Sequence, residues 1–246
     1  LKKNNFNVVL GGNIGTPVLN LNIKKNTFLI IEASSFQLSH SQFISPKFAI
    51  LLNITNDHLD WHGSMQNYSN SKFKIFNLQK KNDFALINTK LKNIFKKKKY
   101  LCKNVPIKTN AYNRIKHKLK NIYLKSGANN ENMYFVYTLS KLLKISENSF
   151  LKSLNTFKGL PHRYEIFLKK RNITFVNDSK ATSLRSAKLA LENSKNIHWI
   201  VGGLPKEKDK INLNSVKKNI FKAYIIGENT KFFKNKVYKK IEFWLG

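Results

Sequence analysis

Cysteine is almost missing from this chain, because Cys102 is the only one in 246 residues. A single thiol rules out an internal disulfide framework and a cysteine-ligated zinc site. We therefore expect a reducing, cytoplasmic environment. Long apolar runs are missing too, since none approaches the roughly 18 residues that a membrane-spanning helix needs. Residues 1–10 run directly into an apolar stretch without the pattern of a signal peptide, and we expect no membrane insertion.

Acidic residues and arginine are also scarce. Thirteen Asp and Glu stand against 45 Lys and Arg, which gives a formal net charge of +32. Such a charge ordinarily indicates nucleic acid or an anionic surface. Only four of the basic residues are arginine, however, and the lysines are spread along the chain instead of interleaving with aromatics as nucleic-acid surfaces do. The lysine run 96–99 is typical of a solvated face, so we expect no nucleic-acid partner; a basic nucleic-acid-binding module is the alternative from a different class.

Short apolar strands alternate with helical patterns along the chain, which is typical of an α/β fold with a parallel sheet. The strands are expected at residues 7–10, 28–31, 48–52, 84–88, 173–177, 197–201 and 223–226. The helices are expected at residues 16–21, 66–78, 130–143, 147–154 and 183–193. Gly159-Leu160-Pro161 interrupts the alternation, which then restarts, so we place a domain boundary near residue 160.

The most informative stretch is residues 53–63, Asn-Ile-Thr-Asn-Asp-His-Leu-Asp-Trp-His-Gly, followed on a helix by Lys72. It comes directly after an expected strand, and ligands of open α/β sheets bind beyond the carboxyl ends of the strands. Carboxylates, imidazoles such as His58 and an amine suit a metal-phosphate site. The same residues also occur in ordinary turns and helix caps, and on this stretch alone the two interpretations stand level.

Two further segments end strands. Residues 11–15, Gly-Gly-Asn-Ile-Gly, would let the backbone approach a ligand closely, although a tight turn explains them as well. Glu32 ends the next strand and precedes Ser34 and Gln37. A carboxylate followed by small hydroxyls fits Mg²⁺ coordination, and a capped helix start is the competing explanation.

A separate set of residues suits a nucleotide. Asn129 and Asn132 stand three apart on an expected helix and would face the same way, where paired amides can read an adenine edge. Helix capping is the competing explanation for both residues, and on the sequence alone it is favoured. Arg163, at the expected domain junction, could reach a triphosphate with two hydrogen bonds.

The segment 177–182, Asn-Asp-Ser-Lys-Ala-Thr, follows the first strand of the expected second domain. Asp178 could accept hydrogen bonds from ribose hydroxyls. Lys180 and Thr182 could hold a carboxylate at the helix start. An Asp or Ser cap explains part of the segment, but it does not explain the lysine between them.

Together these segments resemble the Mur ligase family of ATP-dependent amino-acid ligases. The matching segments are residues 11–15, 32–38, 53–63 with Lys72, 159–165 and 177–182, and the turn Gly202-Gly203-x-x-Lys206. The resemblance covers nearly the whole chain outside residues 90–126. The segment 53–63 is shared among sister ligases, whereas 11–15 and 177–182 are typical of the member that adds D-glutamate.

The resemblance implies a fold and a reaction. Residues 1–159 would form the family's central ATP-binding parallel sheet, and 160–246 an incomplete Rossmann-like C-terminal ligase domain. ATP would phosphorylate the carboxylate of UDP-N-acetylmuramoyl-L-alanine, and the D-glutamate amine would displace phosphate from the acyl phosphate, in peptidoglycan synthesis. Such transfer depends mostly on positioning and on neutralising charge. A sister Mur ligase or a folylpolyglutamate-type ligase is the alternative within the fold.

The resemblance also implies roles for individual residues. It makes Lys72 the family's carbamylated lysine, because a neutral amine can react with CO₂ to give an anion that binds Mg²⁺. Lys72, His58 and Lys180 would be the catalytic residues. The metal would be held by Glu32, His58 and Lys72, with Asp57 nearby; the muramoyl substrate by Asn13, Ser34 and Gln37; ATP by Asn129, Asn132, Arg163 and Asp178; and D-glutamate by Lys180 and Thr182.

The chain departs from the family pattern in three places. The family's Gly-Lys-Ser/Thr phosphate loop and its UDP-binding domain do not precede residues 11–15, and the Ser- and Phe-containing end of the D-glutamate pocket does not follow Trp244. Ala128 stands where the family commonly has histidine. We expect a fragment with negligible turnover by itself, and a monomer.

Overall fold

The computed structural model describes residues 1–125, 127–192, 194–204, 212–237 and 242–245. The chain forms two compact units. The first comprises Leu1–Leu119 with Glu131–Asn155, and the second comprises Lys120–Asn130 with the chain from Thr156 onward. Each unit is described by itself. The domain limits 1–159 and 160–246 stay a prediction.

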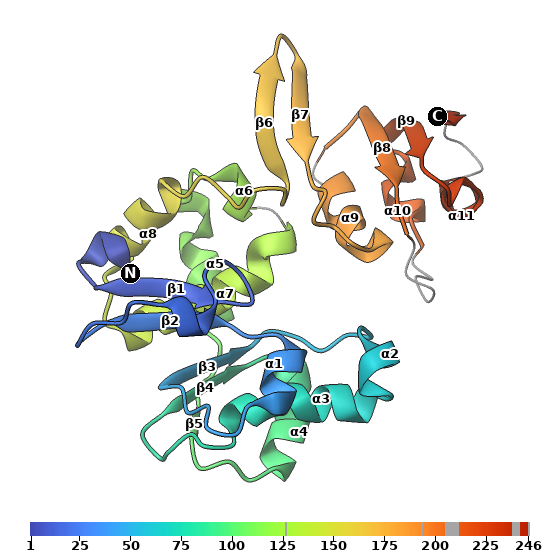
Figure 1. Cartoon of the computed structure of the whole chain (residues 1–246). Helices are drawn as coiled ribbons and strands as arrows, with labels where there is room; N and C mark the ends of the chain where they lie inside the picture. Colours follow the sequence, from blue (N-terminus) through green and yellow to red (C-terminus); the bar gives the residue numbers. More distant parts are fainter. Residues whose placement is uncertain (126, 193, 205–211, 238–241, 246) are drawn as a thin grey trace. The chain divides into compact units, whose positions relative to one another are not determined.

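Parallel strands form the centre of the first unit. β1 (Val8–Gly12) pairs with β2 (Phe28–Glu32), and β3 (Phe48–Leu51), β4 (Phe84–Ile87) and β5 (Lys103–Asn104) pair in that order (Figure 1). Parallel strands require crossover connections, and helical segments supply them here. The expected α/β class is therefore confirmed.

Helices and short 3₁₀ turns precede, connect and follow these strands. The α-helices are α1 (Ser35–His40), α2 (Leu59–His62), α3 (Met65–Phe73), α4 (Lys92–Lys97), α5 (Thr109–Ile115), α7 (Gly127–Leu142), of which residues 127–130 belong to the second unit, and α8 (Glu147–Asn155). The 3₁₀ turns are η1 (Lys2–Asn4), η2 (Val18–Asn20), η3 (Lys74–Phe76), η4 (Thr89–Leu91) and η5 (Lys116–Lys118). The side chains of Phe73 and Phe76 are fully buried against β3 and β4, and Cys102 belongs to the same core. Truncating either phenylalanine to alanine should cost about 3–5 kcal/mol.

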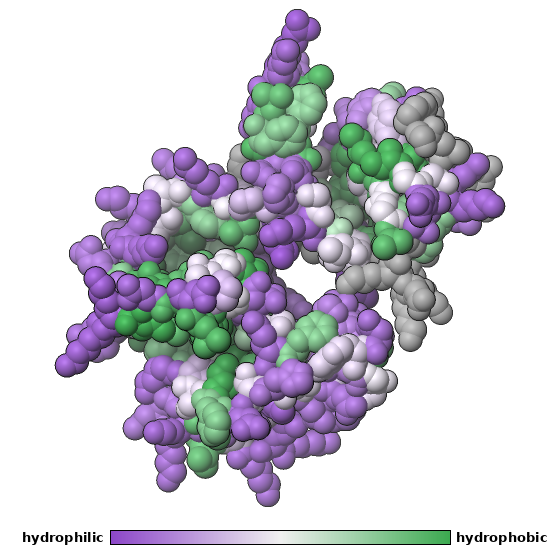
Figure 2. Space-filling model, in the orientation of Figure 1, coloured by the Kyte–Doolittle hydropathy of each residue, from purple (hydrophilic) through white to green (hydrophobic). Residues whose placement is uncertain are grey.

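β1 and β2 present an apolar surface to solvent. Leu10, Leu29, Ile30 and Ile31 are all exposed. Figure 2 shows green, hydrophobic surface where Figure 1 draws β1 and β2. No described helix of the chain is long and apolar enough to cross a membrane.

The second unit holds an antiparallel hairpin and a parallel sheet. β6 (Glu165–Lys170) pairs with β7 (Ile173–Asn177), and the parallel strands β8 (Ile197–Gly202), β9 (Ile220–Ile226) and β10 (Glu242–Leu245) lie in the order β10-β9-β8. Its helices are α6 (Ile122–Lys125), α9 (Leu184–Leu191), α10 (Asn214–Lys217) and α11 (Thr230–Val237). A second core gathers around Val216, Ala223 and Ile225.

One expected helix is wrong. Residues 16–21 form only η2, because Pro17 is extended, with φ −53° and ψ 145°, and the chain leaves the turn in an extended conformation at Leu21. β6 and the elements within residues 90–126 were not expected. β6 carries two lysines and exposed apolar residues on a two-stranded ribbon, so it lacks the pattern of a buried strand.

Candidate functional site

His58 and Lys72 lie around one aromatic ring of the first unit. The ammonium of Lys72 is 4.9 Å from the ring centroid of Tyr68, a cation–π contact, and the ring centroids of His58 and Tyr68 are 6.3 Å apart. The structure thus brings together two of the three predicted metal ligands.

His58 has an unusual backbone conformation. Its φ is +54°, in the left-handed region that costs free energy for a residue other than glycine. Its backbone N–H donates to Oδ1 of Asp57 at 3.1 Å, and its Nε2 is 3.6 Å from Asp57 Oδ2. The ring stands edge-on to Phe36, with centroids 4.8 Å apart. These contacts fix the direction of the imidazole.

Glu32 and Asn13 meet at the ends of the paired strands β1 and β2. The backbone N–H of Asn13 donates to the Glu32 carbonyl at 2.8 Å, and both side chains are exposed. Gly12, with φ +115°, allows this contact, since a Cβ there would lie 2.3 Å from the Glu32 carbonyl oxygen. The close backbone approach at Gly12 is therefore to the neighbouring strand, and the expected approach of residues 11–15 to a ligand stays a prediction.

Ser34 and Gln37 form a capping box at the start of α1. The Gln37 N–H donates to Ser34 Oγ at 3.2 Å, and the Ser34 N–H donates to Gln37 Oε1 at 3.0 Å. The competing explanation, a capped helix start, is confirmed. Contact with a substrate stays a prediction for both residues.

The predicted ligands fit Mg²⁺ on one chemical condition. Among the residues that the structure describes, no three His, Cys, Asp or Glu side chains are grouped so that they could hold a metal ion. Glu32 and His58 supply one carboxylate and one imidazole, whereas Mg²⁺ prefers oxygen ligands. An unmodified Lys72 would repel the cation, but its carbamate would add anionic oxygens. The donor set therefore fits Mg²⁺ only with Lys72 carbamylated.

A second cluster gathers around Tyr123 in the second unit. The side-chain amide of Asn129 donates to the Tyr123 carbonyl at 2.8 Å. Burial raises the pKa of the Tyr123 phenol, with Asn129 and Arg163 acting in the opposite direction and Asp178 in the same one. The structure thus brings Asn129, Arg163 and Asp178 together. Asn132 lies one turn further along α7 and is exposed.

Asp178 is a partly buried carboxylate. Its Oδ1 accepts a hydrogen bond from the Tyr164 N–H at 2.8 Å. Burial raises its pKa above the usual range, although that hydrogen bond and the charge of Arg163 both act to lower it. His162 and Tyr164, on either side of Arg163, both have positive φ. The backbone N–H of Lys180 donates to the His162 carbonyl at 3.1 Å. The two segments that carry Arg163 and Asp178 are therefore tied together.

Thr182 lines a cavity of about 260 Å³ at the start of α9. Ser183 caps that helix by accepting from the Ser186 N–H, and Phe232 and Phe233 contribute apolar walls. Lys180 is exposed and is not among the lining residues. Lys206, of the expected Gly-Gly turn, lies outside the described residues.

A family profile described as Mur ligase middle domain matches residues 5–148. The chain belongs to the Mur ligase family. Two curated relatives, both named UDP-N-acetylmuramoylalanine–D-glutamate ligase, come from Rickettsia felis, at 34% identity over 95% of this chain, and from Rickettsia bellii, at 32% over 99%. The alignments cover 56% and 59% of those proteins, so this Mur ligase chain spans a little over half of their length.

Solved Mur ligase structures share the fold. The crystal structure of MurF ligase from Thermotoga maritima in complex with ADP superposes with a TM-score of 0.67, at 17% identity, over 100% of this chain and 65% of that one. MurF from Acinetobacter baumannii gives a TM-score of 0.58 at 13% identity. At such identities the likeness shows the fold alone, and it confirms the Mur-type α/β architecture.

Two residues of these clusters have no role in the sequence-based predictions. Tyr123 falls in the weakly patterned stretch 90–126, which carries no signal for it. His62 belongs to the informative stretch 53–63, yet it is buried, with 6% of its surface exposed. Burial lowers the pKa of His62; His58 and Lys72 act in the same direction and Asp60 opposes them. Its ring is therefore uncharged near neutral pH.

Proposed function

We propose that the protein is an ATP-dependent ligase that joins D-glutamate to UDP-N-acetylmuramoyl-L-alanine in peptidoglycan synthesis. The observation that carries the proposal is the segment 177–182, which places Asp178 beside Tyr123 and Arg163 and places Thr182 in a cavity of small-molecule size. The curated relatives named for this reaction support it. We also propose that it is a cytoplasmic monomer whose partners are these small molecules.

The second unit would hold ATP and the incoming amino acid. The carboxylate of Asp178 would accept from the ribose hydroxyls, and the Arg163 guanidinium would contact the phosphates. Asn129, in the second unit, and Asn132, which follows it on α7 in the first unit, would read the adenine edge. Thr182 and Lys180, at the start of α9, would hold the carboxylates of D-glutamate, since a helix start attracts anions.

The first unit would hold the reacting carboxylate of the muramoyl substrate. Asn13, Ser34 and Gln37 would lie along that substrate. The carboxylate attacks the γ-phosphorus of ATP and releases ADP, and the amine of D-glutamate then attacks the acyl carbon and expels phosphate. Glu32, His58 and carbamylated Lys72 would hold Mg²⁺, which when bound neutralises phosphate charge.

Amino-acid substitution in a phosphate-release assay tests the proposal. The enzyme made from the complete gene should release phosphate with ATP, the UDP-sugar substrate and D-glutamate, and not with L-glutamate, diaminopimelate or D-alanyl-D-alanine. Thr182→Val should raise the KM for D-glutamate while the KM for ATP is unchanged. Thr174→Val, at an exposed threonine of β7, is the matched control. Turnover with another amino acid would instead identify a sister ligase.

A further inference from the structure

His62 connects three helices of the first unit through one imidazole ring. The residue ends α2; its Nε2 is 2.9 Å from Ser35 Oγ on α1, and its Nδ1 is 3.5 Å from Ser71 Oγ on α3. Its carbonyl accepts from the side-chain amide of Asn67 at 3.0 Å. Both serines are buried, so these hydroxyls meet the ring away from water.

The hydrogen-bond pattern fixes where the ring carries its proton. The Ser71 hydroxyl donates its only hydrogen to the Asn67 carbonyl at 2.9 Å. Nδ1 must therefore be the donor in its contact with Ser71. A neutral imidazole has one N–H, so Nε2 accepts from the Ser35 hydroxyl. An uncharged His62 with the proton on Nδ1 satisfies both contacts.

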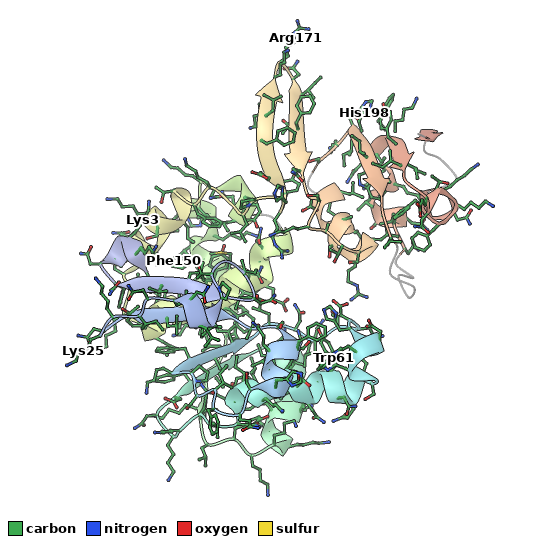
Figure 3. The ribbon with its side chains drawn as sticks, viewed as in Figure 1. Lys3, Lys25, Trp61, Phe150, Arg171 and His198 are labelled. Atoms are coloured by element: carbon green, nitrogen blue, oxygen red, sulfur yellow. The ribbon has the colours of Figure 1, made fainter. Side chains whose placement is uncertain are left out.

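Aromatic neighbours hold the ring in place. Phe36 stacks on it with centroids 5.6 Å apart, and Tyr68 lies 5.1 Å away. Trp61, labelled in Figure 3, stands edge-on at 4.5 Å. The ring cannot leave this position without losing both hydrogen bonds and these contacts.

We propose that His62 is a positioning residue that holds α1 against α3 and so sets the distance between the substrate-binding end of α1 and Lys72. Ser35 directly follows Ser34, and Ser71 directly precedes Lys72. A displacement at either serine is thus transmitted to a neighbouring site residue. The kinetic consequence rests on the proposed ligase function.

Substitutions that keep the packing but remove the hydrogen bonds test this role. In the complete enzyme, His62→Phe should lower kcat by about 10- to 100-fold, the scale expected for a displacement of about 1 Å. The KM for ATP and for D-glutamate should stay within about twofold of the unsubstituted enzyme, because none of the residues proposed to hold them belongs to α1, α2 or α3. His62→Gln, whose amide reaches the Nε2 position, should recover part of the loss. His117→Phe, at an exposed histidine, is the control.

A kcat for His62→Phe close to that of the unsubstituted enzyme would overturn the proposal, and so would a change in both KM values as large as the change in kcat. If His62→Phe does not fold, the double variant Ser35→Ala/Ser71→Ala keeps the ring and removes both partners, and the same kinetic pattern is expected.

Nuclear magnetic resonance gives a readout that is independent of ligase activity. In the 246-residue chain labelled uniformly with ¹³C and ¹⁵N, His62 should show a neutral ring with the proton on Nδ1. His62→Phe should shift the side-chain resonances of Gln37 and Lys72. A proton on Nε2, or unchanged resonances, would overturn the proposal even if the ligase assay shows no turnover, a result that would count against the proposed function alone.

Discussion

At the scale of single residues, Lys72 carries the most demanding requirement. Its ammonium lies over Tyr68, a position that stabilises a cation, yet the proposed chemistry needs an anion at the same place. The proposed reaction with CO₂ would resolve the conflict, since a carbamate reverses the charge and creates oxygen ligands.

We therefore expect Lys72→Ala to lose ligase activity and to regain part of it when a short-chain carboxylic acid is added, because the acid replaces the carbamate. Phosphate release by the complete enzyme measures both. Lys141→Ala is a matched control, since the Lys141 ammonium lies 5.1 Å from the Tyr137 ring without a predicted role. Near-normal activity of Lys72→Ala would remove the carbamate from the mechanism.

Asp178 is held where its charged form is disfavoured. The carboxyl of Asp178 has a higher pKa in the folded chain than in the unfolded chain, where the pKa is near 3.8. Protonation therefore stabilises the folded state at a pH below 3.8, and this stabilisation is lost as the pH rises through the folded-state pKa. An asparagine side chain in its place would carry no charge and could still accept from the Tyr164 N–H.

Asp178→Asn should accordingly gain free energy of unfolding relative to the unsubstituted chain as the pH rises from about 4 to about 7, while the KM for ATP rises. Urea unfolding across this pH range measures the first effect. A difference that shrinks with rising pH would contradict the assignment.

Gly12 is constrained by a neighbouring atom and not only by its backbone angles. Gly12→Ala should destabilise the chain by more than Gly15→Ala. Both glycines have positive φ, which costs about 1–3 kcal/mol for alanine, but only at Gly12 would the new Cβ meet a backbone oxygen. The difference in Tm between the two variants measures the cost of the steric clash at Gly12. Equal losses of stability would argue against the Gly12–Glu32 contact.

At the scale of elements, Glu131 fastens the start of α7 to the ends of two strands. Its Oε1 accepts from the side-chain amide of the buried Asn88, after β4, and its Oε2 accepts from that of Asn53, after β3, at 3.4 Å. One carboxylate thus orients the helix that carries Asn132.

Glu131→Ala should cost about 1–3 kcal/mol, because it leaves the buried amide of Asn88 without its acceptor. Glu147→Ala removes another glutamate, which forms a solvent-exposed ion pair with Lys118 at 2.9 Å, and should cost about 0–1 kcal/mol. Chemical denaturation of both variants measures the difference. A loss at Glu147 as large as that at Glu131 would mean that the buried amide is not decisive.

Sequence patterns predict the positions of the strands better than they predict which side chains contact one another. β3 and β4 begin where expected because each is a buried apolar run of β-forming residues. The capping box of α1 is readable as Ser34-x-x-Gln37, and the structure contains it. The left-handed backbone of His58 and the place of Tyr123 beside Asp178 depend on contacts between distant segments, which periodicity does not encode.

At the scale of the whole molecule, the net charge of +32 opposes the folded state, because like charges are closer together in it than in the unfolded chain. Salt shortens the range of this repulsion from about 30 Å at 0.01 M to about 10 Å at 0.1 M.

Raising KCl from about 10 to about 200 mM should therefore stabilise the chain, on the order of 1 kcal/mol or about 2–4 °C in Tm. Calorimetry measures the shift, and a comparison with potassium sulfate separates screening from the exclusion of sulfate from the surface. A Tm that falls with KCl would contradict the repulsion.

Duplex DNA should not bind at near-physiological salt; salt-sensitive binding there would revive the nucleic-acid alternative.

The contact between Gly12 and the Glu32 carbonyl also has a genetic consequence. Every amino acid other than glycine carries a Cβ, so any missense change in the Gly12 codon adds an atom 2.3 Å from that oxygen. Glycine codons share their first two bases, and only the third can vary without this effect. In a chain rich in lysine, asparagine and isoleucine, whose codons are rich in adenine and thymine, we expect these two guanines to be retained.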